Sequence, residues 1–153
     1  MNVLLKRFYK MIEEKKKMLF LCTGNSCRSQ MAEGLMRKYF GEYFDVFSAG
    51  INPSKVNPKT IEVMREIDVD ISKHTSKSVN LFLNNSFDYV ITVCDNAMET
   101  CPIFLGKVKN RLHWSFEDPA EAKGTEGQIL KKFREVRDLI KDRILTHFKS
   151  ECL

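Results

Sequence analysis

Short apolar segments and longer segments of helical periodicity alternate along this chain, and this order limits the possible folds more than any other feature. Residues 88–94 (DYVITVC) are rich in β-branched residues and apolar on both faces, which is typical of a buried parallel strand. The other predicted elements are strands at 18–21, 45–48 and 112–116 and helices at 30–40, 58–66 and 127–148. This order predicts a single α/β domain over residues 18–153, with three layers, a four-stranded parallel sheet and helices on both faces.

Composition and the length of the apolar runs exclude several classes of protein. With 43% hydrophobic and 29% charged residues, the chain has the composition of an ordinary globular domain. Its apolar runs are too short to span a bilayer, and its N-terminus lacks the features of a secretory signal. We therefore expect a cytoplasmic protein with no membrane-spanning helix.

The cysteines fit neither a disulfide framework nor a zinc site. Five is an odd number, and cytoplasmic thiols are normally kept reduced. The closest spacings are C-x4-C and C-x6-C, and the three histidines lie far from either pair. We predict no metal site, so each cysteine is either a buried apolar residue or a reactive thiol. The five are Cys22, Cys27, Cys94, Cys101 and Cys152.

The first 17 residues form a basic N-terminal extension. They contain six Lys or Arg and two Glu, and so carry +4 of the chain's formal charge of +5. Such a segment could contact nucleic acid or anionic lipid, but no motif of a nucleic-acid reader follows it. We expect a solvated extension with no nucleic-acid or membrane partner. Apolar residues at helical spacing fit a short helix laid on the domain equally well.

The segment after the first strand, Cys-Thr-Gly-Asn-Ser-Cys-Arg-Ser at 22–29, has the features of an oxyanion site. In parallel α/β sheets the ligand lies at the carboxyl ends of the strands, and a helix N-terminus favours anions there. Gly24 and Asn25 tolerate a left-handed backbone, which lets successive N–H groups point inward. Arg28 offers a planar fork for two oxygens, and the same field favours a thiolate nucleophile at Cys22. The predicted substrate-binding residues are Thr23, Gly24, Asn25, Ser26, Cys27 and Ser29.

Two residues of this loop have alternative interpretations. Ser29 either donates a hydrogen bond to the Cys22 sulfur or caps the following helix, and both roles are compatible. Cys27 is expected to pack within the loop rather than act as a second nucleophile. The whole segment could also be a tight strand-to-helix turn with a buried cysteine, although such a turn needs neither the arginine nor the run of small polar residues.

Three patterns occur together in this sequence: CTGNSCRSQMAEG at 22–34, Cys94 with Cys101-Pro102, and HWSFEDPA at 113–120. Together they resemble the thioredoxin-coupled arsenate reductases, which have the low-molecular-weight tyrosine phosphatase fold. The resemblance runs from about residue 18 to the last predicted helix. The loop pattern is shared with the phosphatases, and the later cysteines are what favour the reductases.

The resemblance implies a relay of three cysteines in the reduction of arsenate to arsenite. In this relay Cys22 attacks arsenic, Cys94 attacks Cys22 to release arsenite, and Cys101 captures Cys94 in a disulfide that thioredoxin reduces. The chemistry fits, because thiols can reduce As(V) held on sulfur to As(III), whereas P(V) is not reduced in this way. Taken singly, Cys94 and Cys101 would be ordinary buried cysteines.

A carboxylate over the bound anion is the usual general acid in this chemistry, because an oxygen that leaves the oxyanion must be protonated. The resemblance assigns that role to Asp118, and Pro119 stiffens the chain just after it. Adjacent Glu117 is the alternative acid. Both carboxylates could also belong to a solvated acidic turn.

Two other functions remain open from the sequence. A low-molecular-weight phosphotyrosine phosphatase would use only Cys22, Arg28 and Asp118. Such phosphatases usually have aromatic residues after the Asp-Pro pair, whereas Ala120, Glu121 and Ala122 follow here, which favours a smaller inorganic substrate. The other function is an anion-binding or nucleic-acid-binding module without catalysis.

The resemblance also bears on cofactors. Relatives often hold a potassium ion beside the loop, with residues that correspond to Asn25, Glu33, Ser48 and a position that is usually Asp. That position is Lys77 here. Exchanging a carboxylate for an ammonium makes cation binding unfavourable. We therefore expect no bound cofactor, with the Lys77 ammonium near Glu33 in place of the ion, or else a lysine that points to solvent.

Overall fold

The computed structural model describes residues 1–12, 14–95 and 102–152. Its sheet has four strands in the order β2-β1-β3-β4, and every neighbouring pair is parallel. The strands are β1 (Lys16–Cys22), β2 (Phe44–Gly50), β3 (Ser86–Thr92) and β4 (Lys107–His113). The helices are α1 (Val3–Ile12), α2 (Arg28–Phe40), α3 (Pro58–Arg65) and α4 (Glu126–Cys152), with the short 3-10 helices η1 (Val79–Phe82) and η2 (Pro119–Glu121).

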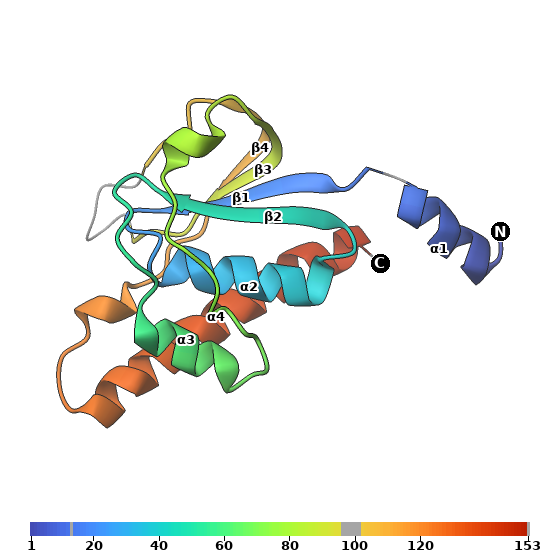
Figure 1. Ribbon diagram of the computed structural model, residues 1–153. Coiled ribbons are helices and arrows are strands. Elements are labelled where there is room, and N and C mark those ends of the chain that lie inside the picture. The colour runs from blue at the N-terminus through green and yellow to red at the C-terminus, as the bar shows by residue number, and fades with distance from the viewer. Residues whose placement is uncertain (13, 96–101, 153) are drawn as a thin grey trace.

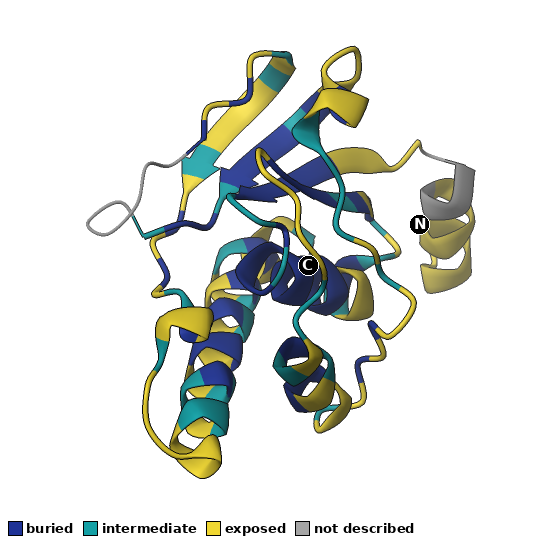
Figure 2. Cartoon of the chain, turned by 60° about the vertical axis from the view of Figure 1, so that its left-hand side comes forward, coloured by how far each residue is buried: buried dark blue, intermediate teal, exposed yellow. Residues whose placement is uncertain are grey.

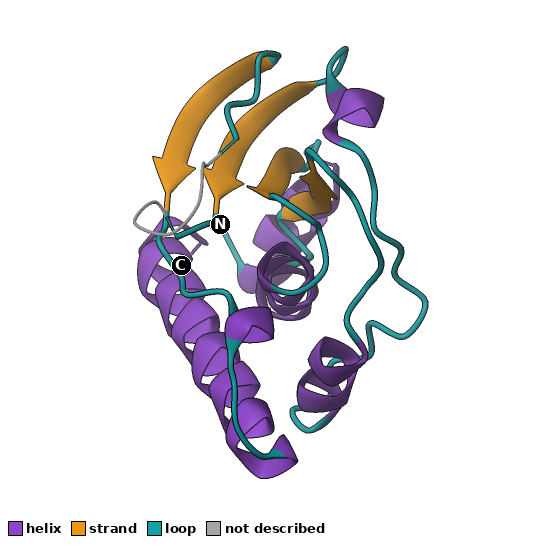
Figure 3. Cartoon of the chain, turned by 90° about the vertical axis from the view of Figure 1, so that its left-hand side faces the viewer, coloured by secondary structure: helices purple, strands orange, loops and turns teal. Residues whose placement is uncertain are grey.

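The elements lie in layers about the sheet. Helices α2, α3 and α4 gather against one face, and η1 lies on the opposite face (Figure 1). The four-stranded parallel α/β fold predicted from the sequence is therefore confirmed. Because the strands are parallel, their carboxyl ends point to the same edge, which the arrowheads mark in Figure 3.

Each face of the sheet has its own apolar core. Along β1, Phe20 and Cys22 pack in the cluster beneath α2 and α4, while Leu19 and Leu21 pack in the cluster on the opposite face. This alternation follows from the period of two in a strand, and burial on both faces explains why the strand appears in the sequence as a continuous apolar run. Figure 2 shows the buried residues concentrated in the central strands and the inner sides of the helices.

The start of α3 agrees with the sequence signals. Asn57 is the N-cap, and its side chain accepts a hydrogen bond from the Lys59 backbone N–H at 2.9 Å. Pro58 occupies the first helical turn, where a missing N–H costs nothing. The predicted N-cap and first-turn proline are both confirmed.

The fourth strand lies earlier in the chain than predicted. The expected strand at 112–116 is wrong, because β4 ends at His113. β4 is an edge strand with mostly exposed side chains, so it has no apolar run. The apolar residues that suggested a strand, Trp114 and Phe116, belong to the next segment, which is buried in the core without joining the sheet.

The basic extension contains a helix that leaves the domain. Helix α1 lies beyond the amino end of β1, and residues 1–9 are all exposed (Figures 1 and 2). The helix predicted by the apolar spacing is present, but its described side chains are not packed on the domain. Among the described residues, no helix is both long and apolar enough to cross a membrane.

Candidate active site

The loop at 22–29 lies at the carboxyl end of β1, which pairs with β2 on one side and β3 on the other. It leads directly into α2, which begins at Arg28. A depression of about 420 Å³ opens over this loop. Its lining combines the loop with residues after β2 and β4: Cys22, Thr23, Gly24, Ser26, Cys27, Arg28, Asn52, Ser54, Asp118, Ala120 and Glu121. The structure thus brings Cys22 and Arg28 of the loop and Asp118, which is distant in the sequence, to one depression.

Asn25 anchors the loop from beneath. It is fully buried and has a φ of 49°, in the left-handed region that asparagine tolerates. Its side-chain oxygen accepts hydrogen bonds from the Lys77 backbone N–H at 2.9 Å and from Gln30 Nε2 at 3.0 Å. Its side-chain nitrogen donates to Ser29 Oγ at 2.8 Å and to Ser48 Oγ at 2.9 Å. Gly24 has no positive φ, so in this pair only Asn25 uses the left-handed conformation.

These bonds orient a hydroxyl proton toward the Cys22 sulfur. Ser29 Oγ lies 2.8 Å from Cys22 Sγ. Because Ser29 Oγ accepts from Asn25, its own hydroxyl proton is available for the sulfur, which is the arrangement that a thiolate accepts. On the other side of Asn25, the Ser48 hydroxyl donates to Glu33 Oε1 at 3.0 Å. The side chains form a connected chain from the buried carboxylate to the sulfur.

Arg28 and Asp118 face each other across the depression. Arg28 is buried, donates from one guanidinium nitrogen to the Phe116 carbonyl at 3.0 Å, and holds another nitrogen 3.7 Å from Asp118 Oδ2. Asp118 is the N-cap of η2 and accepts from the Ala120 backbone N–H at 3.0 Å. Glu117 is instead exposed and ion-paired with Lys132 at 3.1 Å. Of the two adjacent carboxylates, Asp118 is the one that lines the depression.

The other cysteines differ in their surroundings. Burial raises the pKa of the Cys27 thiol to about 11, which suits a packing residue. Cys94 is buried just after β3 and belongs to the same core cluster as Cys22. Cys101 lies outside the described residues. Cys152 is the last residue of α4, a helix that runs along the domain away from the loop.

Lys77 lies where the sequence led us to expect it. Its Nζ is 3.9 Å from Glu33 Oε1 and donates to the Thr75 carbonyl at 2.8 Å. Glu33 also contacts His74 Nδ1 at 2.9 Å and Arg37 at 3.2 Å. Burial alone would raise the pKa of Glu33, but the hydrogen bond from His74 and the nearby cations lower it overall. A carboxylate with these partners does not fit a further cation.

Sequence reasoning missed two residues that shape the loop. Gln30 donates to the Asn25 carbonyl at 3.2 Å and to the Thr75 carbonyl at 3.1 Å, and so joins the loop to a distant segment. Gly50 ends β2 where the loop passes: a Cβ there would lie 2.5 Å from the Thr23 carbonyl oxygen. A glycine at a strand end is a signal of close backbone approach, and it could have been used.

Residues 17–151 match the family described as low molecular weight phosphotyrosine protein phosphatase. The chain is 50% identical over 136 residues to an arsenate reductase of Oceanobacillus iheyensis, which covers 89% of this chain and 97% of that protein. It is 46% identical over 131 residues to an arsenate reductase of Bacillus subtilis, which covers 86% and 94%.

Solved structures agree with these relatives. One is described as an arsenate reductase in the phosphate binding state, with a TM-score of 0.74, 35% identity and coverage of 88% of this chain and 98% of that one. Another is a thioredoxin-dependent arsenate reductase of Corynebacterium glutamicum, with a TM-score of 0.65, 27% identity and coverage of 95% and 70%. The chain therefore belongs to the low molecular weight phosphotyrosine protein phosphatase family and, within it, to the arsenate reductases.

Proposed function

We propose that this protein reduces arsenate to arsenite through Cys22, Cys94 and Cys101, with thioredoxin as the electron donor. The observation that carries the proposal is the convergence of Cys22, Arg28 and Asp118 on one depression over the loop. Relatives named arsenate reductase, one of them solved in a phosphate binding state, support an oxyanion as the ligand. The C. glutamicum structure supports thioredoxin as the partner.

In the first step, the loop N–H groups and Arg28 hold arsenate while the Cys22 thiolate attacks arsenic. An As–S bond forms and one As–O bond breaks. The departing oxygen takes a proton from Asp118 and leaves as water. The 3.7 Å contact between Arg28 and Asp118 supports this arrangement, because the proposed acid then lies beside the proposed anion-binding group.

In the second step, the thiolate of Cys94 attacks the sulfur of Cys22. A disulfide forms, the As–S bond breaks, and its electron pair stays on arsenic, which leaves as arsenite. Cys101 then attacks Cys94, so that a Cys94–Cys101 disulfide forms and the Cys22 thiolate is released. The dithiol of thioredoxin reduces that disulfide and supplies the two electrons. The burial of Cys94 in the same cluster as Cys22 supports the first transfer.

The test couples thioredoxin, thioredoxin reductase and NADPH to the protein and follows arsenate-dependent oxidation of NADPH. We expect steady turnover, its loss in Cys22→Ser, and unchanged turnover in the matched control Cys152→Ser. Cys94→Ser and Cys101→Ser should each abolish repeated turnover while any hydrolysis of a small aryl phosphate persists. Repeated reduction of arsenate by both of these variants would contradict the relay.

The same assays separate the two alternatives. A phosphatase would hydrolyse the aryl phosphate with Cys22, Arg28 and Asp118 and would not oxidise NADPH with arsenate. The residues that follow Asp118 in η2 are Pro119, Ala120 and Glu121, which provide no aromatic ring to hold a phenyl group. A binding module would retain its anion affinity in Cys22→Ser and turn over neither substrate.

A further inference from the structure

Helix α1 has an apolar side that nothing in the described part of the chain covers. Leu4 is 76% exposed and Phe8 is 61% exposed, and Met1 and Leu5 are exposed as well. At 100° per residue, Leu4, Leu5 and Phe8 lie within about 100° of arc, so they form one stripe along the helix. Exposed apolar side chains that gather in this way mark an interaction surface.

The opposite side of α1 is basic. Lys6 and Arg7 are exposed and lie on the helix away from the stripe, and the exposed Val3 of the first turn lies between them. Tyr9, also exposed, lies at the border between the two sides. An apolar stripe with a basic polar side and an aromatic residue at the border is the pattern of a helix that lies in a membrane interface. With 10 residues, α1 is too short to span a bilayer.

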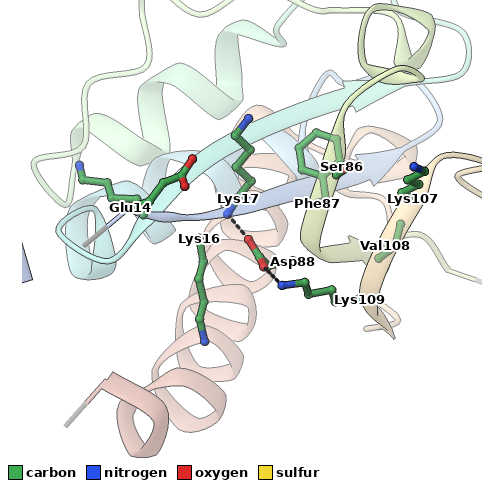
Figure 4. Close-up of a pocket in the computed structure, with 10 residues that line it drawn as sticks. Glu14, Lys16, Lys17, Ser86, Phe87, Asp88, Lys107, Val108 and Lys109 are labelled. Carbon is green, nitrogen blue, oxygen red and sulfur yellow. Dashed lines mark hydrogen bonds and ion pairs between the residues drawn. The ribbon is translucent and has the colours of Figure 1, made fainter. Parts of the chain in front are cut away.

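The domain continues this basic surface. The strand pairing aligns the first residues of β1, β3 and β4, so Lys16, Lys17, Lys107 and Lys109 meet at the amino edge of the sheet. We call these four residues the edge lysines. All four are exposed, and they line an open depression with Asp88, which pairs with Lys109 at 3.5 Å and accepts from the Lys17 backbone N–H (Figure 4). The edge remains basic after this one ion pair.

We propose that α1 and the edge lysines attach this protein to the surface of an anionic lipid bilayer. The stripe of α1 enters the apolar boundary of the headgroups, and the basic residues contact the lipid phosphates. The active-site loop is at the carboxyl edge of the sheet, opposite to the edge lysines (Figure 1), so it faces the aqueous phase when the protein is attached.

Charge complementarity favours lipid over the other occupants of this surface. A nucleic acid would bind the lysines but would leave Leu4 and Phe8 in water. A second copy of the chain would bring two basic extensions together, and the like charges would repel each other. Folding α1 back on its own domain would cover the stripe but would leave Lys6 and Arg7 without an anionic partner. An anionic bilayer provides both an apolar boundary for the stripe and phosphates for the basic residues.

The experiment measures co-sedimentation of the full-length protein with vesicles of phosphatidylglycerol mixed with phosphatidylcholine, and with vesicles of phosphatidylcholine alone. We expect binding to the anionic vesicles that weakens as salt is added, and little binding to the neutral ones. Leu4→Glu/Phe8→Glu should lose binding, whereas the matched control Leu81→Glu/Leu139→Glu, with two exposed leucines elsewhere, should keep it. Circular dichroism and thermal melting check that each variant is folded.

Charge variants complete the test. Lys16→Glu/Lys107→Glu should weaken vesicle binding by about fivefold or more for each basic residue lost, whereas the control Lys73→Glu/Lys131→Glu should bind as the unmodified protein does. Absence of binding to anionic vesicles would overturn the proposal. So would equal binding by Leu4→Glu/Phe8→Glu, tight binding of a DNA duplex by that variant, or a dimer in sedimentation velocity that this variant abolishes.

Discussion

At the scale of single residues, Glu33 is a buried carboxylate, and its hydrogen-bond and ion-pair partners all stabilise the ionised form. Ser48 donates to it, and His74, Arg37 and Lys77 surround its oxygens. Because the carboxylate is buried, removing one of these partners would leave a poorly compensated charge, which is costly. The ionisation of Glu33 is therefore linked to the stability of the loop above it.

This linkage predicts a pH dependence for the variant Glu33→Gln. The pKa of Glu33 is lowered in the folded protein from its ordinary value of 4.5, so its ionised form stabilises the fold above that pH. That stabilisation is lost as the pH falls through the folded pKa. We expect the difference in free energy of unfolding between the unmodified protein and Glu33→Gln to be full above about pH 5 and to shrink below 4.5. Urea titrations across this range measure it.

The control for this prediction is Glu117→Gln, which removes an exposed carboxylate paired with Lys132. Exposed pairs contribute little, so the control should change stability by less than about 1 kcal/mol at any pH. A difference for Glu33→Gln that stays constant down to the lowest pH would contradict the linkage.

Lys77 predicts the response of the protein to potassium. Its ammonium already lies beside Glu33, so exchanging potassium for sodium at constant ionic strength should leave stability and turnover unchanged. Lys77→Asp should create a dependence on potassium, worth about 1.4 kcal/mol of stability at ten times the dissociation constant of the ion. Thermal melting in the two salts measures both effects. Potassium stimulation of the unmodified protein would show that the ammonium does not take the place of the ion.

The sequence was sufficient to find the loop, its arginine and its cysteine, because these residues are neighbours in the chain. The sequence did not indicate that the Asn25 side chain makes four hydrogen bonds beneath the loop, or that Gln30 joins the loop to the segment of Thr75. Their partners Ser48, Thr75 and Lys77 come from segments whose proximity depends on the fold. The relay could not be compared with geometry at Cys101, which lies outside the described residues.

At the scale of elements, the start of α3 is joined to the active-site loop. Asn57, its N-cap, also donates its backbone N–H to the Ser26 carbonyl at 3.1 Å. The N-cap of α3 is therefore held in place by the active-site loop, and the loop in turn packs against a capped helix. The contact between the two segments links the stability of α3 to the shape of the loop at 22–29.

Asn57→Ala should therefore lower the free energy of unfolding by about 1 kcal/mol, because it removes the side-chain acceptor for the Lys59 N–H. Asn57→Asp keeps the acceptor and should stay within a few tenths of a kcal/mol of the unmodified protein. Chemical denaturation measures both. The matched control is Asn52→Ala, which removes an exposed asparagine side chain that caps none of the described helices. Equal losses from Asn57→Ala and Asn57→Asp would show that the cap is not the cause.

Elements with a strong periodic pattern were predictable, and elements without one were not. β3 is buried on both faces and appears as a continuous apolar run, and α4 is buried along one face, so its apolar residues repeat at the helical period. β4 is an exposed edge strand, and its backbone hydrogen bonds to β3 define it rather than its side chains. A pattern of side chains cannot reveal such a strand, and for this reason the prediction was displaced toward Trp114.

At the scale of the whole molecule, the two edges of the sheet have different chemistry. The carboxyl edge holds the loop, Arg28 and Asp118, and the amino edge holds the edge lysines and leads to α1. Parallel strands make this separation possible, because all four begin at one edge and end at the other. Attachment at the amino edge and chemistry at the carboxyl edge can therefore be altered independently.

Removal of residues 1–12 tests this independence. Since the described side chains of α1 are exposed, the truncated protein should unfold within about 0.5 kcal/mol of the full chain, and it should reduce arsenate in solution at the same rate. Denaturation and the coupled NADPH assay measure these two quantities. A large loss of stability would mean that α1 packs on the domain in solution.

Asn25 also determines which groups donate and which accept in the hydrogen bonds beneath the loop. Its amide group sends one N–H toward Ser29 and the other toward Ser48, so the hydrogen bonds diverge from it to the sulfur on one side and the carboxylate on the other. Hydrolysis of the Asn25 side-chain amide would give an aspartate of almost the same shape. Its carboxylate accepts hydrogen bonds but has no proton to donate. The two serine hydroxyls would then turn inward toward the new carboxylate, so Cys22 would lose the Ser29 hydroxyl and Glu33 the Ser48 hydroxyl. Deamidation of Asn25 would therefore remove the Ser29 hydroxyl proton from the Cys22 sulfur.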